Sequence, residues 1–97
     1  MNGMRAIHPG EILREEYLAP MSMSASALAL ALRVPAPRVN DIVRERRGVS
    51  PDTALRLARF FGTSAQFWLN LQSGYDLKIA TLASGKRVEK EVQPRAA

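Results

Sequence analysis

The sequence predicts an all-α fold, a bundle of five short helices. In five successive segments, apolar residues recur three and four positions apart. Each segment begins near a serine that can cap a helix or a proline that fits a first turn. No β-hairpin pattern occurs in residues 1–83, and the chain contains no internal repeat. The length of 97 residues suits a single small domain. A domain of this size has a thin stability margin, so self-association would help it.

The first helix is expected to begin at His8-Pro9-Gly10-Glu11. Proline fits the first turn, where its missing N–H costs nothing, and Glu11 complements the positive end of the helix. The pattern stops before Pro20. Its apolar residues are Ile12, Leu13, Tyr17 and Leu18. His8 is the only histidine, and no nucleophile or carboxylate is identified as its partner, so we interpret it as part of the helix start rather than as a base.

The second and third helices are joined by a short turn. Ser24 is a suitable N-cap for a helix over residues 25–32, whose alanines favour helix. The turn is expected at residues 33–36, and Pro37 lies near the start of the third helix. Val39, Ile42 and Val43 lie on one face of that helix. Gly48 is expected where the chain leaves it and turns.

The fourth helix is expected to begin at Ser50-Pro51, a cap followed by a first-turn proline, and to run to about Phe61. Gly62 would end it. The residues that it should bury are Ala54, Leu55, Leu57, Ala58 and Phe61.

The fifth helix would be capped by Ser64 and end near Ala83, because Ser84-Gly85 interrupts the pattern. We therefore expect a helical domain over residues 1–83 and a C-terminal extension over residues 84–97. The spacing of Val88 and Val92 in this extension suits a helix face and a strand face equally. We expect the extension to be strand-like or flexible.

Composition excludes several classes of function. The chain has no cysteine, so it can hold neither a disulfide nor a zinc–thiolate site. No metal-ligand cluster, nucleophile–base set or phosphate loop is present, so the sequence predicts no catalytic residue, no metal and no cofactor. No apolar run approaches the ~18 residues of a membrane span, and no secretory pattern begins the chain. A cytoplasmic protein is expected.

The second and third helices together suggest a helix-turn-helix. Ala29 and Ala31 provide small side chains where two helices cross, and Val34 can fill the angle between them. The face of the third helix opposite the core would present Ala36, Arg38, Asn40, Asp41 and Arg44. Arginine can donate two hydrogen bonds to guanine, and asparagine can pair with adenine.

The charges are separated along the chain. The formal net charge is +5, and arginines gather in the middle of the sequence, with Arg46 and Arg47 where a DNA backbone would pass. Asp41 can accept from a cytosine amine, or it can pair with Arg38 or Arg44 and repel phosphate. The residues alone leave open a basic surface that binds an acidic protein or RNA.

Three motifs occur in order and resemble the HigA-type antitoxins, lambda-repressor-like proteins of bacterial type II toxin–antitoxin modules. The motifs are HPGE followed by REE, RRGVS followed by RL, and TS followed by FWLNLQ, and the resemblance covers about residues 7–80. It implies a dimeric repressor of its own operon that binds a palindromic operator. It also implies a protein partner, a HigB-type toxin that is a ribosome-dependent mRNA endonuclease.

The resemblance also implies roles for individual residues. The DNA-reading positions would be Ala36, Pro37, Arg38, Asn40 and Arg44, with Arg47 at a common basic position after the recognition helix. Three residues depart from the pattern. Arg33 replaces a common glycine, Ala25 a common glutamine and Pro37 a common serine or threonine, so the operator sequence is not implied. A stand-alone regulator without a toxin, or an interaction bundle without a DNA role, are the alternatives.

Two protein contacts are expected. Glu11, Glu15 and Glu16 form either a solvated helix face or a docking surface for a basic toxin. A homodimer is expected because one helix-turn-helix contacts few bases and two-fold dimers read two half-sites. The residues expected at its interface are Phe67, Trp68, Leu71, Tyr75, Val88 and Val92, where the aromatic residues are alternatively core.

Overall fold

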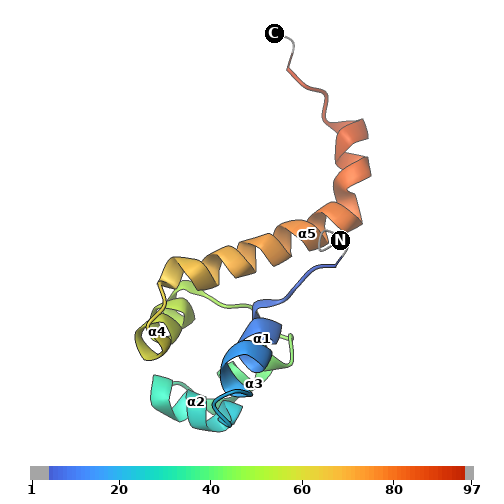
Figure 1. The fold of residues 1–97 in the computed structure, drawn as a ribbon. Coiled ribbons are helices and arrows are strands. Elements are labelled where there is room, and N and C mark those ends of the chain that lie inside the picture. Colours follow the sequence, from blue (N-terminus) through green and yellow to red (C-terminus); the bar gives the residue numbers. More distant parts are fainter. Residues whose placement is uncertain (1–4, 96–97) are drawn as a thin grey trace.

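The structure, a computed structural model, describes residues 5–95; the expected domain ends at residues 1–4 and 96–97 lie outside this part. The described chain is all-α and forms five helical segments without a strand, as the sequence predicts (Figure 1). In order they are α1 (Pro9–Ile12) with its continuation η2 (Leu13–Leu18), α2 (Ala25–Leu32), α3 (Ala36–Val43), α4 (Pro51–Phe61) and α5 (Ala65–Glu91). Across η2 the helix widens to a π-turn, in which the Ala19 N–H donates to the Arg14 carbonyl five residues back.

The predicted caps begin the helices. The hydroxyls of Ser24, Ser50 and Ser64 each accept a hydrogen bond from the backbone N–H three residues later. His8 caps α1, because its Nδ1 accepts from the Gly10 N–H at 2.8 Å. The ring of His8 is buried edge-on against Tyr75, with centroids 4.8 Å apart, and burial lowers the pKa of His8. The interpretation of His8 as a helix-start residue is confirmed.

Two helices end in left-handed residues that are not glycine. Arg33 has φ 61° after α2, and Glu45 has φ 62° after α3. In both cases the next residue returns its N–H to the helix, Val34 to Ala29 and Arg46 to the Asp41 carbonyl, which completes a Schellman motif. The prediction that the chain turns out of α3 at Gly48 is therefore wrong. The turn occurs three residues earlier, because the side chain of Arg14 and the backbone motif hold Glu45 in place.

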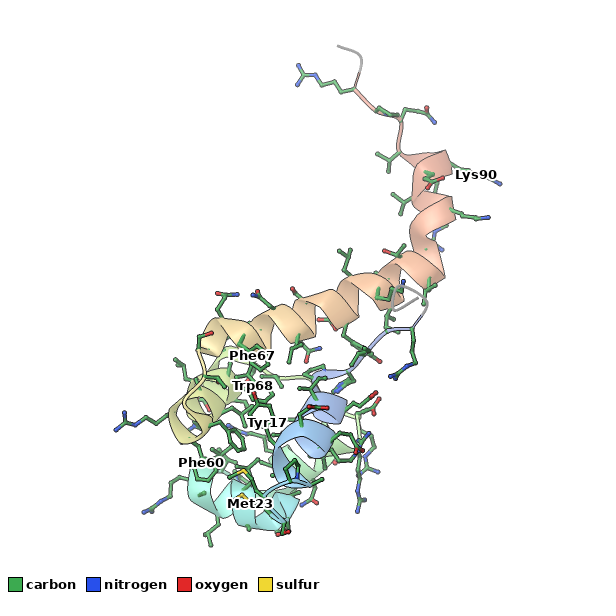
Figure 2. The ribbon with its side chains drawn as sticks, in the orientation of Figure 1. Tyr17, Met23, Phe60, Phe67, Trp68 and Lys90 are labelled. Carbon is green, nitrogen blue, oxygen red and sulfur yellow. The ribbon has the colours of Figure 1, made fainter. Side chains whose placement is uncertain are left out.

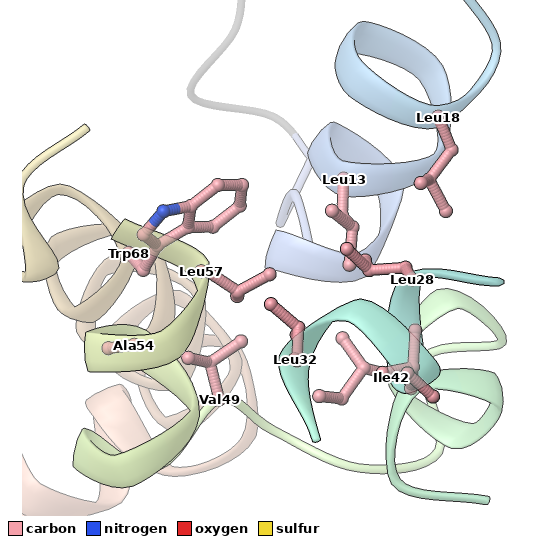
Figure 3. Packing of buried hydrophobic residues seen from close by; sticks show 11 residues of the cluster. Leu13, Leu18, Leu28, Leu32, Ile42, Val49, Ala54, Leu57 and Trp68 are labelled. Atoms are coloured by element: carbon pink, nitrogen blue, oxygen red, sulfur yellow. The ribbon is translucent and has the colours of Figure 1, made fainter. Parts of the chain in front are cut away.

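The core lies where α1, α2, α3 and α4 meet the first half of α5. Figure 2 shows Tyr17 beside Trp68, and their ring centroids are 5.2 Å apart. Figure 3 shows Leu13 and Leu28 facing each other across the core, with Leu57 between them and Trp68. Trp68 is completely buried, and its Nε1 donates to the Thr63 hydroxyl at 2.8 Å.

One predicted core residue of α4 is exposed. Ala54 and Leu57 are fully buried, and Ala58 and Phe61 are partly buried. Leu55, however, is 63% exposed, because it lies on the side of α4 that faces an open groove lined also by Arg59 and Phe60. The prediction that Leu55 is buried is wrong.

α1 and α3 are in close backbone contact at Gly10. A Cβ atom at this position would lie 1.8 Å from the backbone oxygen of Ile42, so only glycine fits. The contact joins the start of the chain to the end of α3. It therefore helps to fix how α3 is presented to solvent.

α5 is longer than the sequence predicts. It continues through Ser84-Gly85 to Glu91, and the next residue, Val92, has extended backbone angles. The prediction of a helix end near Ala83 with a strand-like or flexible extension is thus wrong for residues 84–91. The helix bends in its last third (Figure 1), and glycine–serine pairs are a common cause of such bends.

The last part of α5 leaves the rest of the molecule. We call residues 8–75 the body and residues 76–91 the arm; Lys90 marks the far part of the arm in Figure 2. The radius of gyration is 16.2 Å. A compact chain of 97 residues would have about 12.5 Å, so the arm makes the molecule elongated.

Candidate nucleic-acid interface

α3 is held in the body by one face and presents the other. Val39 and Ile42 are almost completely buried, whereas Ala36 and Pro37 at its start are exposed. Proline at the second helical position and Pro35 at the cap leave the start of α3 without a side-chain cap. The first turn of α3 also contains no acidic residue, so its own side chains do not neutralise the positive end of the helix.

Arg38 lies on this face and is held by a carboxylate of α4. Its Nη1 donates to Asp52 Oδ2 at 2.8 Å, and Asp52 Oδ2 also accepts from Arg56 Nε at 3.0 Å. Arg56 in turn donates from Nη1 to the Leu32 carbonyl at 2.9 Å, at the end of α2. Hydrogen bonds from Arg56 and then Arg38 lower the pKa of Asp52, so the carboxylate stays charged at neutral pH. We call Arg38, Asp52 and Arg56 the arginine clamp.

The two polar residues in the middle of α3 have partners within the chain. Asn40 donates from Nδ2 to the Ala36 carbonyl at 3.0 Å. Asp41 pairs with Arg46 at 3.0 Å and with Arg47 at 3.7 Å. The sequence left open a pair of Asp41 with Arg38 or Arg44, but the structure instead joins Asp41 to the two arginines of the following loop.

The end of α3 is tied to the first helical segment. Arg14 donates to the Val43 carbonyl and, at 3.4 Å, to Glu45. This contact satisfies a backbone acceptor that the end of α3 leaves open. Arg44, the residue after α3, is exposed. Together with Arg38, Arg46 and Arg47, it makes four arginines that lie on or near the presented side of α3.

Sequence reasoning missed the residues that orient this face. Asp52, Arg14 and Arg56 were not predicted to belong to the site. The spacing of Asp52 and Arg56, four apart on one helix, is a signal that could have indicated an ion pair. No comparable signal exists for Arg14 with Glu45, because residues 31 positions apart become neighbours only in the fold.

The predicted acidic surface is partly neutralised. Glu11 accepts two hydrogen bonds from Arg5, at 2.8 and 3.0 Å, and Glu15 pairs with Arg14 at 3.0 Å. Glu16 is exposed and, within residues 5–95, forms no ion pair. Of the three glutamates, Glu15 and Glu16 are the more exposed.

The residues predicted for a dimer interface fall into three groups. Trp68 lies in the core and has no surface left for a partner, so its alternative reading as core is correct. Phe67, Leu71 and Tyr75 are half-buried against the body. The other two, Val88 and Val92, are exposed at the end of the chain, where they are 49% and 63% accessible.

The described residues contain no group of three or more side chains arranged to hold a metal ion. None of the helices within residues 5–95 is long and apolar enough to cross a membrane.

A helix held across a second helix by a three-residue turn, with an arginine-rich outer face, defines a helix-turn-helix protein. Comparison with known families agrees: the model of the helix-turn-helix family HTH_3 matches residues 13–68, more than half of the chain, so the chain belongs to this family. Within it, the chain resembles the HigA-type antitoxins, which are lambda-repressor-like DNA-binding proteins and not enzymes.

Three relatives illustrate the resemblance. Virulence-associated protein I of Dichelobacter nodosus is 67% identical over 79 residues, which cover 81% of this chain and 73% of that protein. The Pseudomonas aeruginosa antitoxin HigA, solved with the higBA promoter, is 60% identical with a TM-score of 0.93, over 95% of this chain and all of the other. Antitoxin GraA in complex with its operator is 54% identical with a TM-score of 0.92, over 100% and 98% of the two chains.

Proposed function

We propose that this protein is a DNA-binding antitoxin that represses its own toxin–antitoxin operon and neutralises a HigB-type mRNA endonuclease. The observation that carries the proposal is the presented face of α3 in a chain 60% identical, over nearly its whole length, to an antitoxin solved with promoter DNA. Such a repressor would act in the cytoplasm, where its operon lies.

Base reading is assigned to the first half of α3. Arg38 can donate two hydrogen bonds to the O6 and N7 of a guanine, because the clamp engages only its Nη1. Asn40 can pair with an adenine once its amide releases the Ala36 carbonyl. Ala36 and Pro37 are exposed at the same end and can contact the thymine methyl group or the backbone.

Backbone contacts are assigned to the end of α3 and the loop after it. Arg44, Arg46 and Arg47 are exposed, and each can neutralise a phosphate. Asp41 lies between the last two and lowers the positive charge that they offer. We assign to Asp41 the role of holding these arginines apart from the bases, so that they contact the backbone rather than a base.

A homodimer is proposed to form through the arm. The stripe of α5 that packs on the body includes Trp68, Gln72 and Tyr75 and, three to four residues further on, reaches Ile79 and Leu82. Ile79 and Leu82 are 43% and 66% exposed, since no other segment of the described chain covers them. A second copy would cover this stripe and bring two α3 helices to half-sites about 34 Å apart in a palindrome.

The toxin is proposed to bind the first helical segment. A ribonuclease surface that holds RNA is cationic, and Glu15 and Glu16 are exposed carboxylates. Charge reversal at Glu16 should weaken inhibition of mRNA cleavage more than reversal at Glu11, whose carboxylate already pairs with Arg5. Equal effects of the two reversals would move the toxin-binding surface elsewhere.

The test is fluorescence anisotropy with DNA from upstream of the gene and a shuffled copy, at about 50 and 200 mM salt. A preference of about 10³-fold for the upstream DNA is expected. Equal and steeply salt-dependent binding to both would leave only a basic surface and favour the interaction bundle. Specific DNA binding without an inhibited toxin would instead favour a stand-alone regulator.

Two substitutions separate the assigned roles. Arg38→Ala should cost about 1–3 kcal/mol on the operator and relax the preference at one base pair. Arg47→Ala should weaken binding to both DNAs alike and reduce the dependence on salt by about one phosphate. The assignment is wrong if both variants lose affinity for operator and shuffled DNA to the same extent.

A further inference from the structure

The clamp joins three elements at the side of the presented face of α3. Asp52 lies in the first turn of α4, Arg56 lies one turn later, and Arg38 lies in the first turn of α3. Arg56 is anchored by the Leu32 carbonyl at the end of α2. The carboxylate that holds Arg38 is thus itself held, through Arg56, by the backbone of the helix-turn-helix.

The clamp fixes the position of Arg38 but uses only one of its three guanidinium nitrogens. Only Nη1 of Arg38 donates within the described chain, and its Nε and Nη2 have no protein acceptor there. A free arginine loses side-chain entropy when it binds a base. An arginine already held at one nitrogen loses less, so its contact with guanine is strengthened by preorganisation.

The carboxylate also changes how Arg38 interacts with DNA of any sequence. A phosphate attracts Arg38 chiefly through charge, and Asp52 beside it offsets that charge. A guanine is recognised through the geometry of two donors, which the contact at Nη1 leaves available. Asp52 should therefore weaken non-specific contacts of Arg38 and strengthen the specific one.

We propose that Asp52, supported by Arg56, is a specificity-determining residue that positions Arg38 for base reading and suppresses its contacts with phosphate. The inference rests on the proposed DNA binding and adds to it two residues of α4 outside the recognition helix. Neither residue needs to touch a base. Their effect on sequence preference passes through Arg38.

The experiment compares Asp52→Asn with Asp76→Asn, which removes the same charge from α5, where Asp76 accepts from Gln72 and lies outside the clamp. Both are titrated with the operator, with a shuffled DNA and with operators changed at one base pair at a time. Asp52→Asn should bind the operator about 10-fold more weakly and the shuffled DNA as tightly as the native protein or more tightly. Asp76→Asn should change the ratio of the two affinities by less than about 2-fold.

A further readout links the effect to Arg38. The base pair at which Asp52→Asn loses discrimination should be the one at which Arg38→Ala loses it, and the double variant should bind like Arg38→Ala alone. Arg56→Gln removes the support of Asp52 and should show the same loss in smaller degree, which keeps the test decisive if Asp52→Asn folds poorly.

The outcomes separate the two proposals. If the native protein binds operator and shuffled DNA equally, the proposed DNA-binding function fails and this inference fails with it. If the native protein is specific, the inference alone is overturned by equal loss on both DNAs, by the same change in Asp76→Asn, or by additive effects of the Asp52 and Arg38 substitutions.

Discussion

The body and the arm differ in what covers α5. In the body, Trp68 is fully buried and Leu71 is half-buried against other helices of the same chain. In the arm, Leu77 and Leu82 are 69% and 66% exposed, although the helix continues without interruption to Glu91. One part of α5 is therefore covered by the rest of the chain, and the other part is exposed. Helical hydrogen bonds form locally along a chain, but burial requires a partner surface.

This difference assigns separate tasks to the two regions. The body orients α3 through contacts from α1, η2, α2 and α4, including Gly10 against Ile42 and Arg14 against Val43. The arm instead carries exposed apolar side chains. Its stability should depend on protein concentration, whereas the stability of the body should not.

The largest expected effect breaks the body. Gly10→Ala places a Cβ 1.8 Å from the Ile42 oxygen, and because that atom belongs to the backbone, the helices must separate. A loss of about 3 kcal/mol or more in the free energy of unfolding is expected from such overpacking. Gly74→Ala is the matched control, since a Cβ there meets nothing within 4 Å, and it should be neutral or stabilising by up to about 1 kcal/mol.

Denaturant unfolding measures both variants. Similar stabilities of the two glycine variants would show that the close approach at Gly10 is not a constraint on the body. Reduced operator affinity in Gly10→Ala is also expected under conditions where the variant remains folded, because the contact fixes the end of α3.

The next largest effect is expected from a substitution that disrupts the proposed dimer contact of the arm and leaves the body folded. Leu82→Glu should raise the dissociation constant of the dimer about 100-fold, which corresponds to about 2.7 kcal/mol of binding free energy. The reason is that the substitution puts a charge into the proposed contact between arms. Leu55→Glu is the matched control, because Leu55 is similarly exposed, at 63%, but lies on the body. Sedimentation equilibrium would measure both, and a dimer unaffected by Leu82→Glu would exclude the arm as its interface.

A smaller effect is expected from the left-handed residues at two helix ends of the body. Arg33 has φ 61°, so Arg33→Gly should relieve left-handed strain and stabilise the chain by up to about 1 kcal/mol. Gly62→Ala tests the reverse change. Because Gly62 has φ 75°, an alanine there should be strained and should destabilise the chain by a similar amount. Thermal unfolding at two protein concentrations should show the same shift at each, and a concentration-dependent shift would mean that the body is coupled to the arm.

The smallest effect is expected from pH. Burial lowers the pKa of His8 below its ordinary value of 6.5, so the unfolded chain takes up the proton more readily than the folded one. The contribution of His8 is complete above pH 6.5 and decreases as the pH falls below it. His8→Asn keeps a cap acceptor without titrating, and should lose less stability than the native protein between about pH 7.5 and 5.5. The same pH profile for both proteins would contradict this role.

Local signals predicted the starts of the helices well. The side chains of Ser24, Ser50 and Ser64 each bond to a backbone N–H within three residues, so a cap can be recognised without the rest of the fold. The helix-turn-helix was predicted for the same reason, since its turn and the buried face of α3 are encoded in adjacent segments. The candidate residues on α3 were also visible, because a helix places every third or fourth residue on one side.

The partners of those residues could not be predicted in the same way. Arg38 meets Asp52 across 14 positions, and Arg14 meets Glu45 across 31, so their contacts depend on how the helices pack. Helix ends were less predictable than helix starts, because Glu45 occupies a left-handed position that sequence reasoning reserves for glycine.

By itself, the sequence determined that this chain is all-α and which segment presents arginines, because propensity, capping and periodicity are properties of neighbouring residues. The three ordered motifs, and not those patterns, determined which family it resembles. Only the tertiary structure decided that Trp68 is core, that Leu55 and Leu82 are exposed, and that Asp52 holds Arg38. Burial and ion pairing depend on which surfaces meet, and residues far apart in the chain meet only after the helices have packed.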